Sequence, residues 1–151
     1  MILRCIARPL LAASFVSGGI DTLRNPGPRV QKAETVAPQI AERVPQLPKD
    51  TGTLVKINAG VQVVAGGLLA LGRLPRLAAS ALAVSLVPTT LAGHRFWEED
   101  EPAQRAQQQI HFLKNFGLLG GLILASVDTG GAPSLSWRAK RAAKRVRTKV
   151  G

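Results

Sequence analysis

Two stretches near the middle of the chain decide its fold: "INAGVQVVAGGLLALG" at residues 57–72 and "LAASALAVSLVPTTLAG" at residues 77–93. Neither stretch contains a charged residue. A helix of a small water-soluble bundle needs a polar face, whereas both of these stretches are apolar all round. The Gly, Ala and Pro residues inside them are typical of helices that pack in lipid. Both stretches therefore predict membrane-spanning helices.

Two further apolar runs bring the number of candidate spans to four. The first, "CIARPLLAASFVSGGIDTL" (residues 5–23), is interrupted by Arg8 and Asp21, and the last, residues 110–128, carries Lys114. A helix needs about 20 mostly apolar residues to cross the hydrocarbon core, and tilt or local thinning accommodates shorter runs. We therefore predict an all-α integral membrane bundle of four transmembrane helices, with spans at about 5–23, 55–72, 76–93 and 110–128.

The N-terminal run also resembles a secretory signal, because basic residues precede a short apolar stretch. It has no clear cleavage site, and its removal would leave an odd number of spans. We therefore expect it to remain as the first span of a membrane domain at residues 1–132, which is followed by a basic tail at 133–151.

The loops between the spans carry helical signals of their own. In "RVQKAETVAPQIAERV" (residues 29–44) the apolar positions recur at helical spacing, which predicts an amphipathic helix on the outer membrane face, bent or broken by Pro38. The segment "EPAQRAQQQIHF" (residues 101–112) predicts a helix that runs into the fourth span. Glu101 is a candidate cap of this helix, and Pro102 is expected at its first position.

The distribution of charge predicts the orientation. The N-terminal lead, the turn at residues 73–76 and the tail contain basic residues and no acid. The positive-inside rule places these three segments in the cytoplasm, so we expect a multi-pass protein of the inner (plasma) membrane with both termini inside. The four consecutive acids at residues 98–101 then mark an outer loop, flanked by Phe96 and Trp97 at headgroup depth.

The tail is expected to lie on the anionic inner leaflet, with Trp137 as an interface anchor and each cation contributing about 1 kcal/mol. The formal net charge is +11, but the cations are segregated and the aromatic residues are few, so no nucleic-acid partner is expected. The predicted membrane-surface residues are Arg138, Lys140, Arg141, Lys144, Arg145, Arg147 and Lys149.

Three segments together resemble a known family: "RPLLAASFVSGGIDTLRNP", "NAGVQVVAGGLLALGRLPRLAA" and "PTTLAGHRFWEEDEPAQRAQQQIHFLKNFGLLGGLIL". They are similar to the actinobacterial branch of the DoxX family of small membrane proteins, over about residues 8–128. The resemblance implies a four-helix membrane protein with cytoplasmic termini. The family takes its name from a small subunit of a thiosulfate:quinone oxidoreductase, and members are linked to membrane redox complexes.

The resemblance implies an accessory or scaffold subunit of a membrane-associated, redox-linked complex, with other membrane or redox proteins as partners. The first alternative is an oxidoreductase subunit that interacts with quinone. A small-solute transporter is less favoured, because four spans with few polar groups make a poor pathway.

Several polar residues fall near the outer ends of the predicted spans, and ionisable groups there are costly unless they pair or face a hydrated cavity. Such a cluster could exchange protons or hydrogen-bond a quinone carbonyl. The structural alternative is that Asp21 pairs with Lys114 or Lys56 and that the histidines lie in interfacial water. The candidate cluster consists of Asp21, Asn58, His94, Arg95, His111, Lys114 and Asn115.

No catalytic residue and no metal site is predicted, since the spacing of His94 and His111 matches no ligand motif. Quinone is the one cofactor left open. Cys5 is expected to be a small apolar filler, and Asp128 is expected to end the fourth span.

Glycines predict where helices approach closely. Gly117 and Gly121 form a Gly-x-x-x-Gly pair in the fourth span, and the second span has a comparably smooth patch. The simpler interpretation is that the second span packs against the fourth, and the alternative is a homo-oligomer. The predicted helix-packing residues are Gly66, Gly67, Gly117, Gly120 and Gly121.

Overall fold

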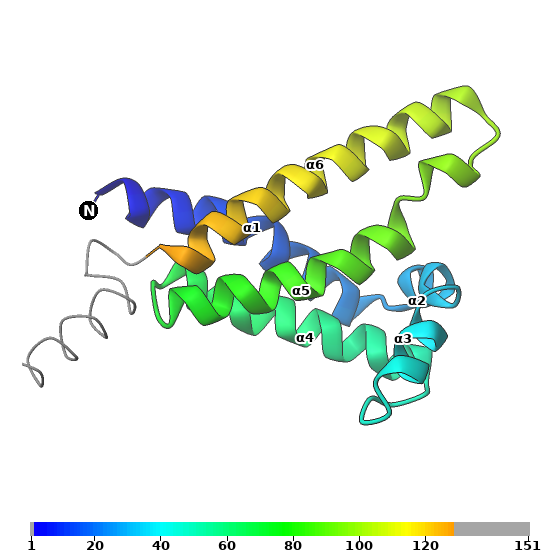
Figure 1. Ribbon diagram of the computed structural model, residues 1–151, viewed down its shortest axis with the longest axis horizontal. Coiled ribbons are helices and arrows are strands. Elements are labelled where there is room, and N and C mark those ends of the chain that lie inside the picture. The colour runs from blue at the N-terminus through cyan, green and yellow to red at the C-terminus, as the bar shows by residue number, and fades with distance from the viewer. Residues whose placement is uncertain (1, 129–151) are drawn as a thin grey trace, which may run out of the picture.

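The computed structural model describes residues 2–128, and within this range every regular element is a helix (Figure 1). Four of the helices are long and apolar enough to cross a membrane, which confirms the predicted fold class. The basic tail, with Trp137 and the predicted membrane-surface residues Arg138 to Lys149, lies outside the described residues. The elements are α1 (Ile2–Arg24), α2 (Gly27–Ala33), α3 (Ala37–Arg43), α4 (Thr51–Ala70), α5 (Pro75–Gly93), the 3₁₀ helix η1 (Phe96–Glu98) and α6 (Pro102–Val127).

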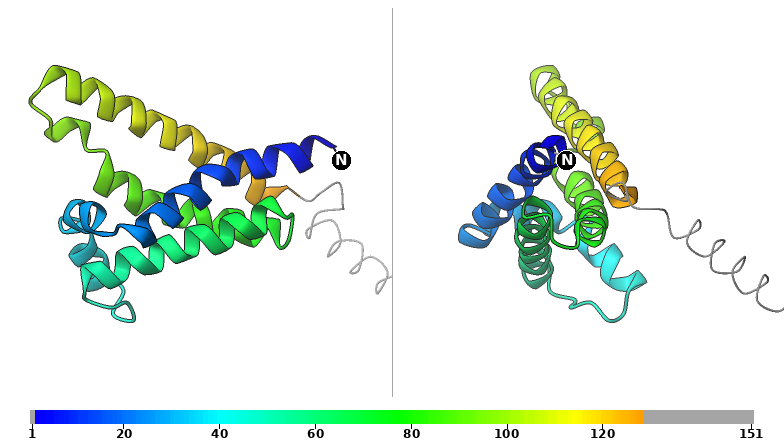
Figure 2. Two further views of the ribbon diagram at one scale, coloured as in Figure 1. Left: turned by 180° about the vertical axis from the view of Figure 1, so that it is seen from behind. Right: turned by 90° about the vertical axis from the view of Figure 1, so that its left-hand side faces the viewer.

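The four long helices run alternately up and down. The N-terminus, the α4–α5 turn and the end of α6 lie together at one end, and α2, α3 and η1 lie at the other (Figures 1 and 2). Packing follows the order α1–α4–α5–α6, and α6 makes only slight contact with α1. The first turns of α6 diverge from the other helices together with η1, as Figure 2 shows. The bundle is therefore closed at one end and open at the other.

Two glycines bring α1 and α4 together. A Cβ atom built at Gly19 would lie 2.9 Å from the backbone oxygen of Ala59, and one at Gly66 would lie 2.7 Å from Cγ2 of Val16. The missing side chains allow the close backbone approach that replaces the hydrophobic effect as a packing force in lipid. Gly66 thus packs against α1, which the sequence did not predict.

The prediction that the second span packs against the fourth is wrong. The main neighbours of α4 are α1 and α5. Gly121 of α6 also faces α1, with its would-be Cβ 3.4 Å from Cδ1 of Leu11. Gly67, Gly117 and Gly120 meet nothing within 4 Å, so they take no part in packing among the described residues.

The α4–α5 turn depends on unusual backbone angles. Gly72 has φ +67°, a conformation that glycine adopts without steric cost. Leu74 is also left-handed, with φ +47°, and Pro75 then opens α5 with its fixed φ. The tight turn predicted at residues 73–76 therefore begins slightly earlier, and Arg76 already belongs to α5.

The core is small and the apolar surface is large. Leu69, Leu82 and Leu122 are fully buried, together with several alanines. Along the whole of α6 only Asn115 and Leu122 are buried. An apolar surface this extensive is costly in water and favourable in hydrocarbon, as expected for a membrane bundle.

The loop helices follow their sequence signals with two differences. The predicted amphipathic helix is divided at residues 34–36 into α2 and α3, and Pro38 lies in the first turn of α3 instead of at the break. Pro102 opens α6 as predicted, but the side chain of Glu101 makes no capping hydrogen bond.

The start of α4 has a cap that the sequence did not predict. Asp50 Oδ2 accepts hydrogen bonds from the hydroxyl and the backbone N–H of Thr53, both at 2.6 Å. These bonds favour the charged form and hold the pKa of Asp50 below its ordinary value.

We predict that Gly19→Ala destabilises the bundle by about 1–3 kcal/mol, because the backbone oxygen of Ala59 cannot move away as a flexible side chain can. Gly18→Ala is the matched control, since nothing lies within 4 Å of its would-be Cβ. Unfolding in mixed micelles by increasing the fraction of denaturing detergent measures both variants. Equal stability of the two variants would contradict the described α1–α4 interface.

Candidate functional site at the open end of the bundle

Polar side chains join α4 to α5 within the apolar part of the bundle. Asn58 Nδ2 donates to Thr89 Oγ1 at 3.0 Å. One turn further along α4, Gln62 Nε2 donates to Ser85 Oγ at 3.1 Å and to Thr89 Oγ1 at 3.2 Å. Gln62 and Ser85 are buried, so these amide–hydroxyl bonds replace hydrogen bonds that water would otherwise supply.

A second contact of the same kind joins α5 to α6. Asn115 Nδ2 donates to Thr90 Oγ1 at 3.1 Å, and both residues are buried. Thr89 and Thr90 are consecutive, so they face different neighbours around the helix. Within residues 2–128 every buried side-chain nitrogen and oxygen has a hydrogen-bond partner. We call the six residues Asn58, Gln62, Ser85, Thr89, Thr90 and Asn115 the polar layer.

A histidine pair lies where α5 ends. The rings of His94 and His111 are stacked with their centroids 5.1 Å apart. His94 Nδ1 lies 2.7 Å from Gln108 Oε1, and His111 Nδ1 lies 3.3 Å from Lys114 Nζ. An amide oxygen only accepts and an ammonium only donates, so these partners place the proton of His94 on Nδ1 and that of a neutral His111 on Nε2.

Beside the histidine pair is an open cleft of about 460 Å³, here called the outer cleft because it lies at the open end of the bundle. Lys32 of α2 lines one side of it, and His94 follows the end of α5. The remaining lining residues recur at three- and four-residue spacing, so they share one face of α6. They are Gln104, Gln107, Gln108 and His111.

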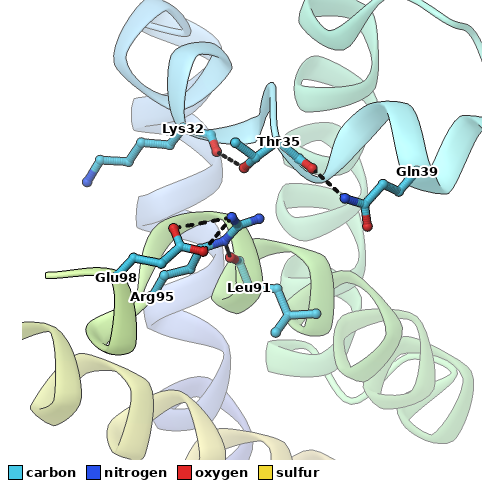
Figure 3. A network of polar contacts seen from close by, with 6 residues as sticks. All are labelled: Lys32, Thr35, Gln39, Leu91, Arg95 and Glu98. Atoms are coloured by element: carbon cyan, nitrogen blue, oxygen red, sulfur yellow. Dashed lines mark hydrogen bonds and ion pairs between the residues drawn. The ribbon is translucent and has the colours of Figure 1, made fainter.

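Local hydrogen bonds fix the two backbone segments near the outer cleft (Figure 3). Thr35 Oγ1 donates to the carbonyl of Lys32, and the Lys32 side chain extends away from this turn. On the facing segment, Arg95 Nε donates to the carbonyl of Leu91 at 2.8 Å, and its guanidinium pairs with Glu98 at 3.0 Å.

The structure separates the predicted polar cluster into distinct groups. Asn58 and Asn115 belong to the polar layer, and His94 and His111 line the outer cleft with Lys114 beside them. Arg95 is engaged with Glu98.

Asp21 lies apart from these groups. The prediction that it pairs with Lys114 or Lys56 is wrong, because its partner is Arg29 of α2. The two residues are near in sequence, and the turn that follows α1 brings α2 back beside the end of the first span.

The sequence did not predict the role of Lys32 and the glutamines in the outer cleft. It also did not predict four residues of the polar layer: Gln62, Ser85, Thr89 and Thr90. A signal for the layer was available. Asn58 and Gln62 stand four residues apart, as do Ser85 and Thr89, so each pair shares one face of its helix. No comparable signal in the sequence brings Lys32 close to α6.

The opposite end of the bundle carries an ion pair that the sequence did not predict. Asp128 follows the end of α6, as expected, and its carboxylate lies 3.0 Å from Arg4 Nε and 3.5 Å from Arg8 NH2. Arg76 Nε donates to the carbonyl of Ser126 at 2.9 Å. Cys5 is exposed, so it is not the small apolar filler that the sequence predicts.

Aromatic residues gather where η1 meets α6. Phe96 and Trp97 each make an edge-to-face contact with Phe112, and the ring of Phe116 stacks on that of Phe112. Edge-to-face pairs of this kind contribute about 0.5–1.5 kcal/mol beyond the buried area. The cluster holds η1 against α6.

The model of the DoxX family matches residues 3–95, which is α1 through the end of α5. This chain belongs to the DoxX family. The match ends before α6, so the likeness of residues 96–128 to this family stays a prediction. A search of curated proteins and a search of solved structures each gave no match.

The chemistry available at the outer cleft is hydrogen bonding and charge. Its lining offers an ammonium, three amides and two imidazoles. Within residues 2–128 no three His, Cys, Asp or Glu side chains gather as a metal site would require. For this DoxX protein the described geometry therefore favours a binding site for a polar ligand.

We predict that Thr89→Val destabilises the bundle by about 0.6–2 kcal/mol, because it removes the hydroxyl that Asn58 and Gln62 share while keeping the side-chain shape. Ser17→Ala is the control, since that hydroxyl bonds carbonyl oxygens of its own helix. Unfolding in mixed micelles compares the two. A Thr89→Val variant as stable as the parent would show that the layer contributes no net stability.

Proposed function

We propose that this DoxX protein is an accessory or scaffold subunit of a membrane-associated, redox-linked complex, and that it docks a transmembrane helix of another membrane protein. Family membership supports the redox link, since the family's naming member is a small subunit of such a complex. The docking role is supported by the surface of α6.

The observation that carries the proposal is the free face of α6. Leu113, Gly117, Gly120 and Leu124 follow one another at helical spacing, on the side opposite the buried Asn115 and Leu122. Leu113 is 59% exposed and Leu124 is 71% exposed, while a Cβ at either glycine would meet nothing. Two leucines around two glycines form the kind of shallow groove into which a neighbouring helix packs in lipid.

We also propose that both termini are cytoplasmic. The end of the bundle that holds the N-terminus carries Arg4, Arg8, Arg73 and Arg76, with Asp128 as the acid paired there. Arginines near the ends of spans are retained in the cytoplasm, and acids have little influence. The outer cleft then faces the outside of the plasma membrane.

A second candidate is a direct interaction with quinone. The stacked His94 and His111 favour it, because a ring N–H can donate to a quinone carbonyl. The two functions make different predictions for His94→Ala and His111→Ala. A quinone site requires these variants to lose quinone-dependent turnover of the complex, whereas a docking role leaves the complex assembled and active.

For the docking role, we predict that Gly117→Leu with Gly120→Leu lowers recovery of partner proteins about tenfold in mild-detergent co-purification. This loss corresponds to about 1.4 kcal/mol, which is the size expected for hot-spot residues of an interface. Gly60→Leu is the control, since nothing lies within 4 Å of a Cβ atom built at Gly60 on α4 either.

Quantitative mass spectrometry of the purified material measures the outcome. Partners lost with the α6 variant and retained with the control support the proposal. A parent protein that purifies alone contradicts it, and so does equal recovery with both variants. If the partner is a second copy of this chain, the proposal of a heterologous partner is wrong.

A further inference from the structure

The outer cleft differs from the free face of α6 in position and in chemistry, so ligand binding there does not depend on the docking role. It lies on the side of α6 that faces α2 and α5, and its lining contains Lys32, two histidines and three glutamines but no acid. The lining therefore offers a positive charge and several hydrogen-bond donors, with no carboxylate to neutralise the charge.

The free donors follow from the contacts of the histidines. Lys114 donates toward Nδ1 of His111, which leaves the proton of a neutral His111 ring on Nε2. Gln108 uses its oxygen to accept from His94, so its amide nitrogen remains a donor. A ligand in the cleft thus meets N–H groups from His111 and Gln108, in addition to the ammonium of Lys32.

Nearby carboxylates do not neutralise the positive charge of the outer cleft. Glu98 pairs with Arg95, and Asp21 pairs with Arg29, so each of these carboxylates has a cation of its own. The acids of the loop before α6 precede its first turn, and none of them lines the cleft. Lys114 adds a further positive charge directly behind His111.

We infer that the outer cleft binds a phosphate-type oxyanion, held by Lys32, by His111 and by the amide groups of Gln104, Gln107 and Gln108. Several acceptor oxygens on one anion match the several donors that converge here, and charge-assisted hydrogen bonds of this kind are the strong ones. The volume of about 460 Å³ exceeds that of phosphate alone, so a substituted phosphate also fits.

Two sources can supply this chemistry at the level where α5 ends: free phosphate from the aqueous side, or the headgroup of an anionic phospholipid. The exposed Phe116 follows His111 by five residues along α6, toward the interior of the membrane. It would leave an attached acyl chain in an apolar environment. The experiment therefore needs one arm for each source.

The first arm titrates the full-length protein in a non-ionic detergent with inorganic phosphate and measures binding by calorimetry. The second arm reconstitutes the protein in phosphatidylcholine nanodiscs with or without phosphatidylglycerol, and native mass spectrometry counts the phosphatidylglycerol molecules retained. Lys32→Gln should weaken binding roughly tenfold, because one charge-assisted hydrogen bond is lost. Lys49→Gln, an exposed lysine of the same loop outside the cleft, should leave it unchanged.

A second pair of variants separates the site from general surface charge. Gln107 lines the cleft, and Gln109 is exposed on the same helix but does not line it. Gln107→Leu should weaken binding several-fold and Gln109→Leu should not, with helical content and elution volume the same for both.

Each outcome decides the inference. Phosphate binding that is weakened by Lys32→Gln and not by Lys49→Gln supports a site for the free anion. The same difference seen only in the retained phosphatidylglycerol supports a headgroup site. Binding of neither probe overturns the inference. Equal losses for Lys32→Gln and Lys49→Gln also overturn it, because they would reflect diffuse electrostatic attraction. Failure here leaves the docking role untouched, since that role depends on the opposite face of α6.

Discussion

The structure depends on one constraint: a polar side chain within the hydrocarbon must find its hydrogen-bond partner inside the protein. Gln62 and Asn115 are buried and Asn58 is partly buried, and the side-chain amides of all three donate to hydroxyls of α5. This makes α5 the common partner of α4 and α6. Because an amide–hydroxyl bond requires a specific distance and direction, the polar layer fixes the register of three helices where apolar contacts alone would allow sliding.

For the same reason, the ion pairs lie at the two ends of the bundle. At one end Asp128 joins the start of α1 to the end of α6 through Arg4 and Arg8. At the other end α1 and α6 diverge, and the space beside α6 is lined by polar groups instead of being filled by apolar side chains. The closed end thus holds the helices together through ion pairs, and the open end exposes hydrogen-bond donors.

The two faces of α6 differ in chemistry, and this difference connects the fold to the proposed functions. Its face toward α5 carries the glutamines, His111, Asn115 and Leu122, and changes from polar to apolar as the helix enters the bundle. The opposite face carries Leu113, Gly117, Gly120 and Leu124, which no element of the described chain covers. One helix can therefore bind a ligand on one side and dock a partner on the other.

Much of the fold could be predicted from the sequence, because uncharged runs of membrane length have few other uses. The spans, the tight α4–α5 turn and the start of α6 at Pro102 all follow from local signals. The partners of the glycines could not be predicted: Gly66 and Gly121 both face α1, and nothing in their own helices reveals this. The true partner of Asp21 and the place of Lys32 in the outer cleft depend on how α2 folds back, which is a tertiary property.

The alternation of the four helices across the membrane is the central claim, and cysteine accessibility tests it most directly. In a Cys5→Ser background, single cysteines replace Arg73 in the α4–α5 turn, Glu34 between α2 and α3, and Asp100 before α6; all three positions are exposed. A membrane-impermeant maleimide should label positions 34 and 100 from one side and position 73 from the other. Labelling of all three positions from the same side would contradict the four-span account.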